Sequence, residues 1–272
     1  MKINPIICFF LFINAFMTSA QETKMPKPFI IGDIQVIKSA ILEEERTLNI
    51  YLPEGFDKQK SYPVIYLLDG SAHEDFLHIV GLVQFYKMQF NMPEFLVVGI
   101  ANVDRKRNFT FHTDLADLKK EYPTTGHSAK FIDFIEKELQ PFVNTTYRTT
   151  QTKYLIGQSL GGLLATEILL KKPNLFTHYL IVSPSLWWDD ESLLNNAKSL
   201  LDKQNEMNQY VYISVGMQEH KMMVKDAKEI AAILKEKKNL KVDYFPMQNE
   251  NHASILHQSI SDAFKKLFPL KD

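Results

Sequence analysis

One serine in this chain lies in a setting that would make its hydroxyl a nucleophile. Residues 154–163 read YLIGQSLGGL, in which Gly157, Ser159 and Gly161 form the pattern G-x-S-x-G. An apolar run precedes the pattern, and a helical run, LLATEILL, follows it. A strand that enters a helix through so tight a turn strains the serine backbone and projects its hydroxyl from the end of the strand. The alternative is a serine that only caps a helix, although capping needs no glycine on both sides.

A serine hydroxyl attacks only when a base removes its proton, and in this arrangement an acid and then a histidine follow the serine along the chain. His252 comes directly after the last expected strand, in QNENHASI, where the base belongs. The alternative for His252 is a polar residue near a helix N-terminus. Glu219, in the loop GMQEHKMMVKD, is the acid that we expect. The second choice, Asp226, falls in the following helix, where a lone Asp is usually a solvated charge.

The negative oxygen that forms during such an attack needs two hydrogen-bond donors. The residue after the nucleophile supplies one, which predicts the N–H of Leu160. The loop after an early central strand supplies the other, and YLLDGSAHEDF offers Ser71 first and Gly70 second. An ordinary Asp-Gly turn remains the alternative for this loop.

Strands and helices alternate between these residues. The pattern predicts strands over residues 48–56, 62–70, 95–103, 153–157, 179–184, 210–216 and 241–247, and helices over residues 131–143, 160–172, 224–238 and 253–268. This alternation is typical of the α/β class, with a mostly parallel central sheet and helices on both faces. Residues 21–272 contain no evident linker, so we expect a single domain. Two long connections, over residues 104–130 and after SPSLWWDDESLL, are rich in aromatic residues. This content favours ordered loops that cover a site.

The N-terminal segment is expected to be a signal peptide over residues 1–20. Lys2 precedes an apolar run, and the small residues Thr18, Ser19 and Ala20 come before Gln21, as at a signal-peptidase site. An uncleaved anchor is the alternative. The single cysteine, Cys8, lies in this segment, so the mature chain would have neither a disulfide nor a cysteine-ligated metal. We therefore expect an exported protein, periplasmic or secreted.

The overall composition excludes some partners. The chain has 31 Lys and Arg against 32 Asp and Glu, a net charge of −1. This balance gives no reason to expect nucleic acid or, once the signal is removed, a membrane surface as partner. The histidines lack the paired spacing of a zinc site, and the chemistry above needs neither a metal nor a cofactor.

Several segments together resemble the Putative esterase family, the esterase D branch of the α/β-hydrolases, with the strongest likeness to siderophore-ester hydrolases. They are YPVIYLLDG, VGIANVDRKRNFT, FIEKELQPFVNTTYRT, YLIGQSLGGLLATEILLKKPNLF, SPSLWWDD and ENHASI. The resemblance implies the α/β-hydrolase fold, Ser159 as nucleophile and His252 as base. It leaves Glu219 open, because some siderophore esterases of the family are described as working with a Ser–His dyad.

The same resemblance draws attention to two pairs of residues. Arg105 and Arg107 match a family segment, DR-x-R, and would receive an anionic or catecholate substrate. Their alternative role is to fix the loop through salt bridges. Trp187 and Trp188 would form an aromatic wall for an aryl or sugar group, or else pack in the core beneath the loop.

The sequence thus predicts an exported serine esterase that acts on a small-molecule or glycan-linked ester. Siderophore-type esters are the first choice of substrate. Four alternatives remain at this point: an esterase that removes acetyl or feruloyl groups from polysaccharides, an acyltransferase with the same site, a non-catalytic binding protein on the same scaffold and, last, a peptidase.

Overall fold

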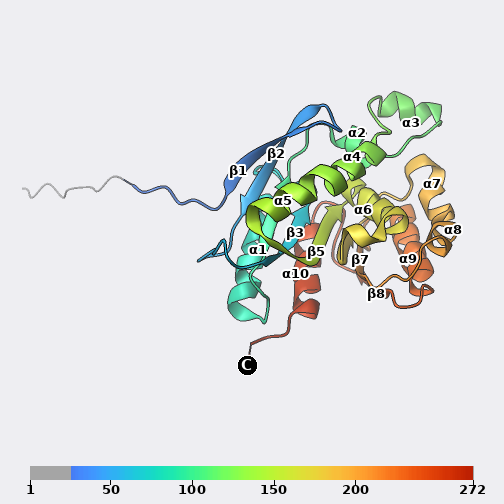
Figure 1. Cartoon of the computed structure of the whole chain (residues 1–272). Helices are drawn as coiled ribbons and strands as arrows, with labels where there is room; N and C mark the ends of the chain where they lie inside the picture. Colours follow the sequence, from blue (N-terminus) through green and yellow to red (C-terminus); the bar gives the residue numbers. More distant parts are fainter. Residues whose placement is uncertain (1–25, 272) are drawn as a thin grey trace, which may run out of the picture. The chain divides into compact units, whose positions relative to one another are not determined.

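The computed structural model of the protein describes residues 26–271 (Figure 1). The expected signal peptide at residues 1–20 lies outside the described residues. The chain divides into two units, Met1–Ile30 and Ile31–Asp272, and all the helices and strands described below belong to the second. Within residues 26–271, no helix combines the length and the apolar character that crossing a bilayer requires.

An eight-stranded sheet forms the centre of the second unit, in the order β1-β2-β4-β3-β5-β6-β7-β8. The two pairings of β2, with β1 and with β4, are antiparallel, and every pairing from β4 to β8 is parallel. The strands are β1 (Asp33–Ser39), β2 (Glu44–Tyr51), β3 (Tyr62–Leu67), β4 (Leu96–Ile100), β5 (Thr149–Gln158), β6 (His178–Val182), β7 (Tyr210–Gly216) and β8 (Lys241–Met247).

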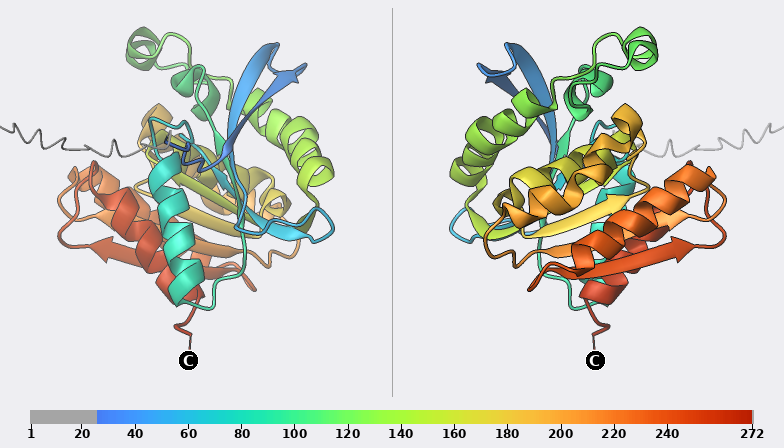
Figure 2. Two further views of the ribbon diagram at one scale, coloured as in Figure 1. Left: turned by 90° about the vertical axis from the view of Figure 1, so that its left-hand side faces the viewer. Right: turned by 90° about the vertical axis from the view of Figure 1, so that its right-hand side faces the viewer.

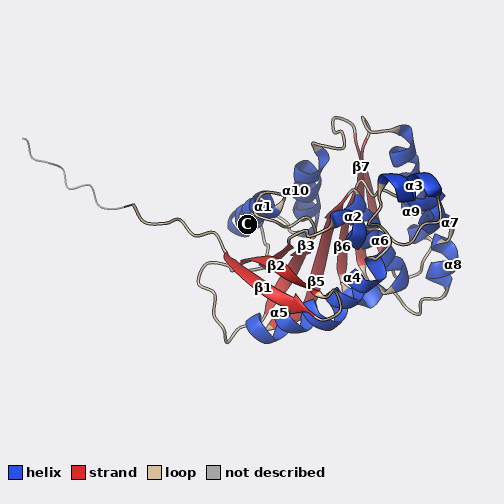
Figure 3. Ribbon diagram, turned by 90° about the horizontal axis from the view of Figure 1, so that it is seen from above, coloured by secondary structure: helices blue, strands red, loops and turns tan. Residues whose placement is uncertain are grey.

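Helices cover both faces of this sheet, and Figures 2 and 3 show the two layers. Helices α1 (Phe76–Gln89) and α10 (Ile255–Leu267) pack together on one face. The other face carries α4 (Ser128–Phe134), the π-helical turn η1 (Ile135–Leu139), α5 (Gln140–Tyr147), α6 (Leu160–Lys171), α7 (Trp188–Asn195), α8 (Ala197–Asp202) and α9 (Lys221–Lys235). The short elements are α2 (Arg105–Phe109), α3 (Ala116–Glu121) and the 3-10 turn η2 (Pro173–Leu175).

The strand β3 shows why the sheet is buried on both faces. Successive side chains of a strand point to opposite sides. Val64 and Tyr66 enter the apolar cluster beneath α4 to α9, whereas Ile65 and Leu67 enter the cluster beneath α1 and α10. A strand between two helical layers must therefore be apolar at nearly every position, as the sequence here is.

The predicted fold class, a mostly parallel sheet with helices on both faces, is confirmed, and two expectations about elements need correction. The sequence pattern did not predict β1, an edge strand of alternating exposure, or the helix α1. The helix expected over residues 131–143 is instead divided by the π-helical turn into α4, η1 and α5. The two long connections are ordered, and they contain the short helices α2, α3, α7 and α8.

Candidate active site

Ser159 lies in the turn between β5, near the middle of the sheet, and α6. Its backbone has φ 60° and ψ −120°, a region that residues with a side chain rarely adopt. The Ser159 N–H donates to Val182 O at 3.0 Å, and its carbonyl accepts from Leu163 N at 2.9 Å. A Cβ on Gly157 would lie 2.4 Å from the Gly161 carbonyl oxygen, so the tight turn requires glycine at the first position of the G-x-S-x-G pattern.

The predicted acid and base are in direct contact. Glu219 follows β7 and His252 follows β8, so both come from the carboxyl edge of the sheet from which Ser159 also projects. His252 Nδ1 is 2.7 Å from Glu219 Oε2. The carboxylate accepts this bond from Nδ1–H, which leaves Nε2 as the nitrogen able to take a proton. The His252 side chain is 46% exposed and that of Glu219 only 1%.

The electrostatics of Glu219 are those of an ionised carboxylate. Burial alone would raise its pKa, but hydrogen bonds from His252, Ser183 and the Gly216 N–H outweigh burial and lower it. The Gly216 N–H donates to Oε1 at 2.8 Å, and the Ser183 hydroxyl donates to the same oxygen at 2.5 Å. A charged carboxylate held in this way can orient an imidazole and stabilise its protonated form.

Asp226, the second choice for the acid, is not the solvated helix charge that we expected. It lies in α9 with a side chain that is fully buried, and its nearest cation is Lys225, 3.5 Å from Oδ1. Burial, then the neighbouring Glu191 charge, raise its pKa to about 6. The inward face of α9 explains the correction, because Asp226 and Ala227 both lie on the side that packs toward the sheet.

The two predicted oxyanion donors come from different segments, the start of α6 and the loop after β3. Leu160 is the first residue of α6, so its N–H has no acceptor within the helix. Ser71 N is 3.4 Å from Glu74 Oε2, a weak contact. Gly70, the second choice, instead donates its N–H to Ile100 O at 3.0 Å. Ser71 is therefore the better donor of the two.

Arg105 forms a partly buried ion pair. Its guanidinium donates to both carboxylate oxygens of Asp69, at 2.6 Å and 2.9 Å. It also donates to the carbonyl of Gln158, the residue before Ser159, at 3.2 Å. Arg105 thus ties the loop of Gly70 and Ser71 to the serine turn. Arg107 is paired with Glu44 at 2.5 Å, and both arginines therefore have the loop-fixing contacts of the alternative role.

The two tryptophans differ in exposure. Trp188 is fully buried and its indole N–H donates to Phe111 O at 3.0 Å. A side chain enclosed in this way cannot line a substrate site, so for Trp188 the expected aromatic wall is wrong and the core-packing alternative holds. Trp187 is half-buried at the edge of the same cluster and keeps some surface for a ligand.

Three polar residues of the site escaped the sequence analysis. Gln158 donates its side-chain amide to His252 O at 2.6 Å. Ser183 binds Glu219, as described above, and Ser185 Oγ lies 3.3 Å from Ser159 Oγ. Gln158 is the first variable position of the G-x-S-x-G pattern, and both serines belong to the SPSLWW segment. The signal in the sequence was thus the position of these residues at the carboxyl ends of β5 and β6, on the edge that carries Ser159.

No hydrogen bond joins Ser159 and His252 in the described part of the chain, where the partner of Ser159 Oγ is Ser185. Catalytic hydrogen bonds are often long or poorly aligned in the absence of substrate, so this geometry is compatible with a nucleophile and its base. Ser159 is half-buried and His252 exposed, which leaves Ser159 accessible from solvent.

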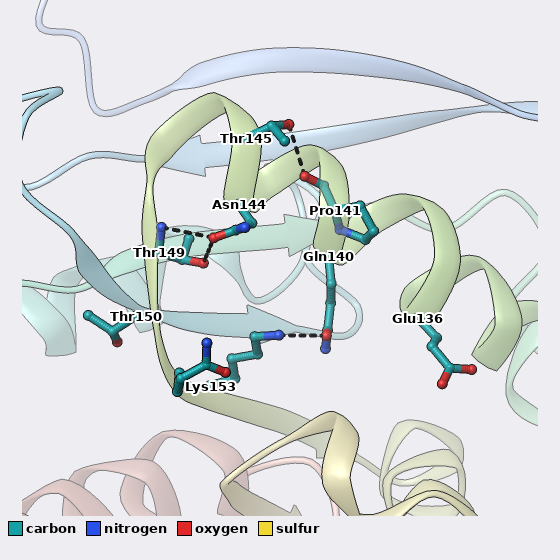
Figure 4. A pocket seen from close by; sticks show the side chains of 9 residues that line it. Glu136, Gln140, Pro141, Asn144, Thr145, Thr149, Thr150 and Lys153 are labelled. Carbon is teal, nitrogen blue, oxygen red and sulfur yellow. Dashed lines mark hydrogen bonds between the residues drawn. The ribbon is translucent and has the colours of Figure 1, made fainter.

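Elsewhere, a polar cavity of about 320 Å³ lies at the amino end of β5, far along the strand from Ser159 (Figure 4). Lys153 fills part of it and donates to Gln140 Oε1 at 2.8 Å. None of the predicted site residues is among those that line it. Among residues 26–271, no cluster of three or more His, Cys, Asp or Glu side chains could hold a metal ion.

Comparison with known proteins gives consistent results. The chain is 28% identical over 267 residues to the ferri-bacillibactin esterase BesA of Bacillus subtilis, covering 87% of this chain and 90% of that protein. The structure resembles the IroE-like serine hydrolase from Shewanella oneidensis, with a TM-score of 0.80 and 30% identity over 87% of this chain and 80% of that one. The BES protein from Bacillus cereus gives a TM-score of 0.78 and 28% identity over 89% and 97% of the two chains. Residues 39–263 match the family described as Putative esterase, so the chain belongs to this family of α/β-hydrolases and is a hydrolase that acts on esters.

Proposed function

We propose that this protein is a serine esterase in which Ser159, His252 and Glu219 form the catalytic triad. His252 Nε2 takes the hydroxyl proton as Ser159 Oγ bonds to the ester carbonyl carbon. The N–H groups of Leu160 and Ser71 stabilise the resulting oxyanion. The intermediate then expels the alcohol, which leaves with the proton from His252. Water repeats the attack on the acyl-enzyme and releases the carboxylic acid.

The observation that carries this proposal is the hydrogen bond between Glu219 and His252, together with the strained turn at Ser159. Three loops, after β5, β7 and β8, deliver a nucleophile, an acid and a base to one edge of the sheet. Glu219 is ionised and buried, and a buried carboxylate needs partners to offset its desolvation. The contact with His252 supports a triad over the dyad that the sequence analysis left open.

We further propose that the substrate is a siderophore-type ester and that the protein is exported. Support for the substrate comes from the relative named as a ferri-bacillibactin esterase, which is similar over most of both chains. Export rests on the N-terminal sequence, with its apolar run and the small residues before Gln21.

The test is hydrolysis of an ester panel by the purified protein beside Ser159→Ala. The panel contains p-nitrophenyl acetate and butyrate, methyl ferulate, acetylated xylan and a catecholate trilactone. The matched control is Ser199→Ala, which removes an exposed serine hydroxyl on α8. Because removal of a triad member costs on the order of 10⁴-fold or more in turnover, Ser159→Ala should be almost inactive and Ser199→Ala unchanged.

The best substrate identifies the branch of the family. Fastest cleavage of the trilactone supports the siderophore ester, whereas release of acetate or ferulate from sugar esters contradicts it. Acyl transfer to an added alcohol in preference to water would make the protein a transferase. Equal inactivity of wild type and Ser159→Ala on the whole panel would overturn the esterase mechanism in favour of a binding protein.

A further inference from the structure

The segment of Ser183, Pro184 and Ser185, directly after β6, contacts two residues of the proposed triad. The Ser183 hydroxyl donates to Glu219 Oε1, and Ser185 Oγ lies 3.3 Å from Ser159 Oγ. Ser183 is fully buried and Ser185 is 2% exposed, so solvent does not compete for either hydroxyl. Each serine therefore contacts the triad from inside the protein.

Backbone contacts fix this segment. The Ser183 N–H donates to Ser214 O of β7 at 2.8 Å, and the Ser185 N–H donates to the carbonyl of Ser159 itself at 3.0 Å. Ser183 has φ 44°, a strained conformation for a residue with a side chain. A Cβ on Gly162 of α6 would lie 2.9 Å from Pro184 Cα, so the helix after the nucleophile packs directly against the segment.

We propose that Ser183 and Ser185 are positioning residues for the ester hydrolysis: Ser183 orients and keeps ionised the acid of the triad, and Ser185 fixes the rotamer of the nucleophile. This inference rests on the proposed roles of Ser159 and Glu219. A donor on Oε1 holds the carboxylate so that Oε2 faces His252 Nδ1. A hydroxyl beside Ser159 Oγ restricts rotation about its Cα–Cβ bond, so the nucleophile reaches the carbonyl from one starting position.

The two serines should then have different effects when each hydroxyl is removed. Without Ser183, the carboxylate loses a hydrogen bond to its charged form, and the proton affinity of the Glu219–His252 pair rises. The rate then falls only where the pair becomes protonated, on the acid side. Without Ser185, no charged group loses a partner. The rate then falls by the same factor at every pH, because fewer nucleophile rotamers are productive.

The experiment measures the rate constant for inactivation by a fluorophosphonate between about pH 5 and pH 9. In this reaction the Ser159 Oγ–P bond forms, the P–F bond breaks, fluoride leaves and His252 takes the serine proton. It reports the nucleophilic step alone and does not depend on the natural substrate. The variants are Ser183→Ala, Ser185→Ala and Ser159→Ala. The control is Ser214→Ala, which loses an equally buried hydroxyl bonded to Ser259 at 2.6 Å, away from the triad.

We expect Ser183→Ala to move the acid limb of the pH–rate profile for labelling to higher pH by about half a unit. Ser185→Ala should slow labelling about 3- to 10-fold at all pH values. Ser214→Ala should keep both the rate and the limb. Ser183→Gly, which fits the positive φ, should move the limb as Ser183→Ala does even if it is the more stable variant.

Two results overturn the inference and leave the triad intact: an unmoved acid limb in both Ser183 variants, or labelling of Ser185→Ala at or above the wild-type rate. A shift of the acid limb in Ser214→Ala equal to that in Ser183→Ala would also overturn it. The loss of any buried hydroxyl nearby would then produce the same effect. Labelling of Ser159→Ala at the wild-type rate overturns the proposed function and this inference together.

Discussion

The two sides of Ser159 are held by different kinds of interaction. On the base side, Glu219 is surrounded by His252, the Ser183 hydroxyl and the Gly216 N–H, and no Lys or Arg among residues 26–271 pairs with it. On the oxyanion side, the Asp69 carboxylate forms a two-bond ion pair with Arg105 and also accepts from Asn102 at 2.6 Å.

This difference follows from what each side has to do. In the proposed mechanism the base side transfers a proton and the oxyanion side does not, so the Glu219 carboxylate has to respond to the charge of one imidazole. An arginine in contact with Glu219 would mask that change, whereas neutral donors keep the carboxylate ionised without a competing charge. The oxyanion side transfers no proton and only needs its N–H groups in position. A strong ion pair is suitable there because it never has to break.

The largest effect is expected from Glu219→Gln. The amide keeps the size of the side chain but carries no charge, and its NH₂ group would meet either His252 Nδ1–H or the donors on Oε1. The imidazole then loses its orientation, and kcat for p-nitrophenyl acetate should fall about 10³- to 10⁴-fold. Glu229→Gln, on the exposed face of α9, is the matched control. A loss below about tenfold would favour a Ser–His dyad.

Arg105→Lys should have the next largest effect. Lysine provides a point charge and cannot donate to both oxygens of Asp69 and to Gln158 O at once. The Ser71 loop would then move relative to Leu160, and kcat should fall about 10²-fold, the usual effect of a displaced oxyanion donor. The acid limb of kcat/KM should stay in place, because the base side is untouched. A loss confined to KM would instead assign Arg105 to substrate binding. Arg148→Lys, an exposed arginine just before β5, is the control.

The sequence was sufficient to predict the residues that the structure places at one edge of the sheet, and most of the elements that carry them. Ser159 was recognisable because a G-x-S-x-G turn needs glycine where backbones meet. Glu219 and His252 were recognisable because the order of strands and helices places their loops at the same edge of the sheet. The long apolar strands were easy to predict, since both of their faces are buried and nearly every position is therefore apolar.

The supporting residues were not predictable, because they depend on contacts between segments distant in sequence. Ser183 reaches Glu219 across 36 positions, and the Asp69–Arg105 pair also spans 36. A serine in a loop or an arginine in a short helix carries no signal of its partner. The same reason explains Asp226 and Trp188. An Asp in a helix and a Trp in a loop segment are both compatible with a surface position, and only the packing of α9 and of the SPSLWW segment buries them.

A smaller effect is expected from Gly162→Ala, which acts on the base side through the Ser183–Ser185 segment. The new Cβ would lie 2.9 Å from Pro184 Cα and 3.0 Å from Val182 O, so the Ser183–Ser185 segment must shift. We expect turnover to fall about tenfold. The strain should lower the free energy of unfolding by about 1–3 kcal/mol and the Tm by a few degrees. Gly81→Ala in α1 is the opposite control. Its Cβ meets nothing within 4 Å, so the substitution should stabilise the helix and leave turnover unchanged.

The smallest effect concerns Asp75, a carboxylate near the oxyanion side. Burial, then the charges of Asp69 and Glu74, raise its pKa to about 7. The folded protein therefore binds this proton more tightly than the unfolded chain does, and the free energy of unfolding falls as pH rises from about 4 to about 7. Asp75→Asn removes this loss. The side chain makes no capping hydrogen bond at the start of α1, so little else changes.

Thermal unfolding of wild type and Asp75→Asn across this range checks the prediction. The Tm of the variant should match that of wild type near pH 4 and exceed it by about 3 °C above pH 7. The acid limb of kcat/KM should coincide in the two proteins, because Asp75 has no contact with the Glu219–His252 pair. If the limb moved instead, proton binding on the oxyanion side would be coupled to the base, and the separation of the two sides would fail.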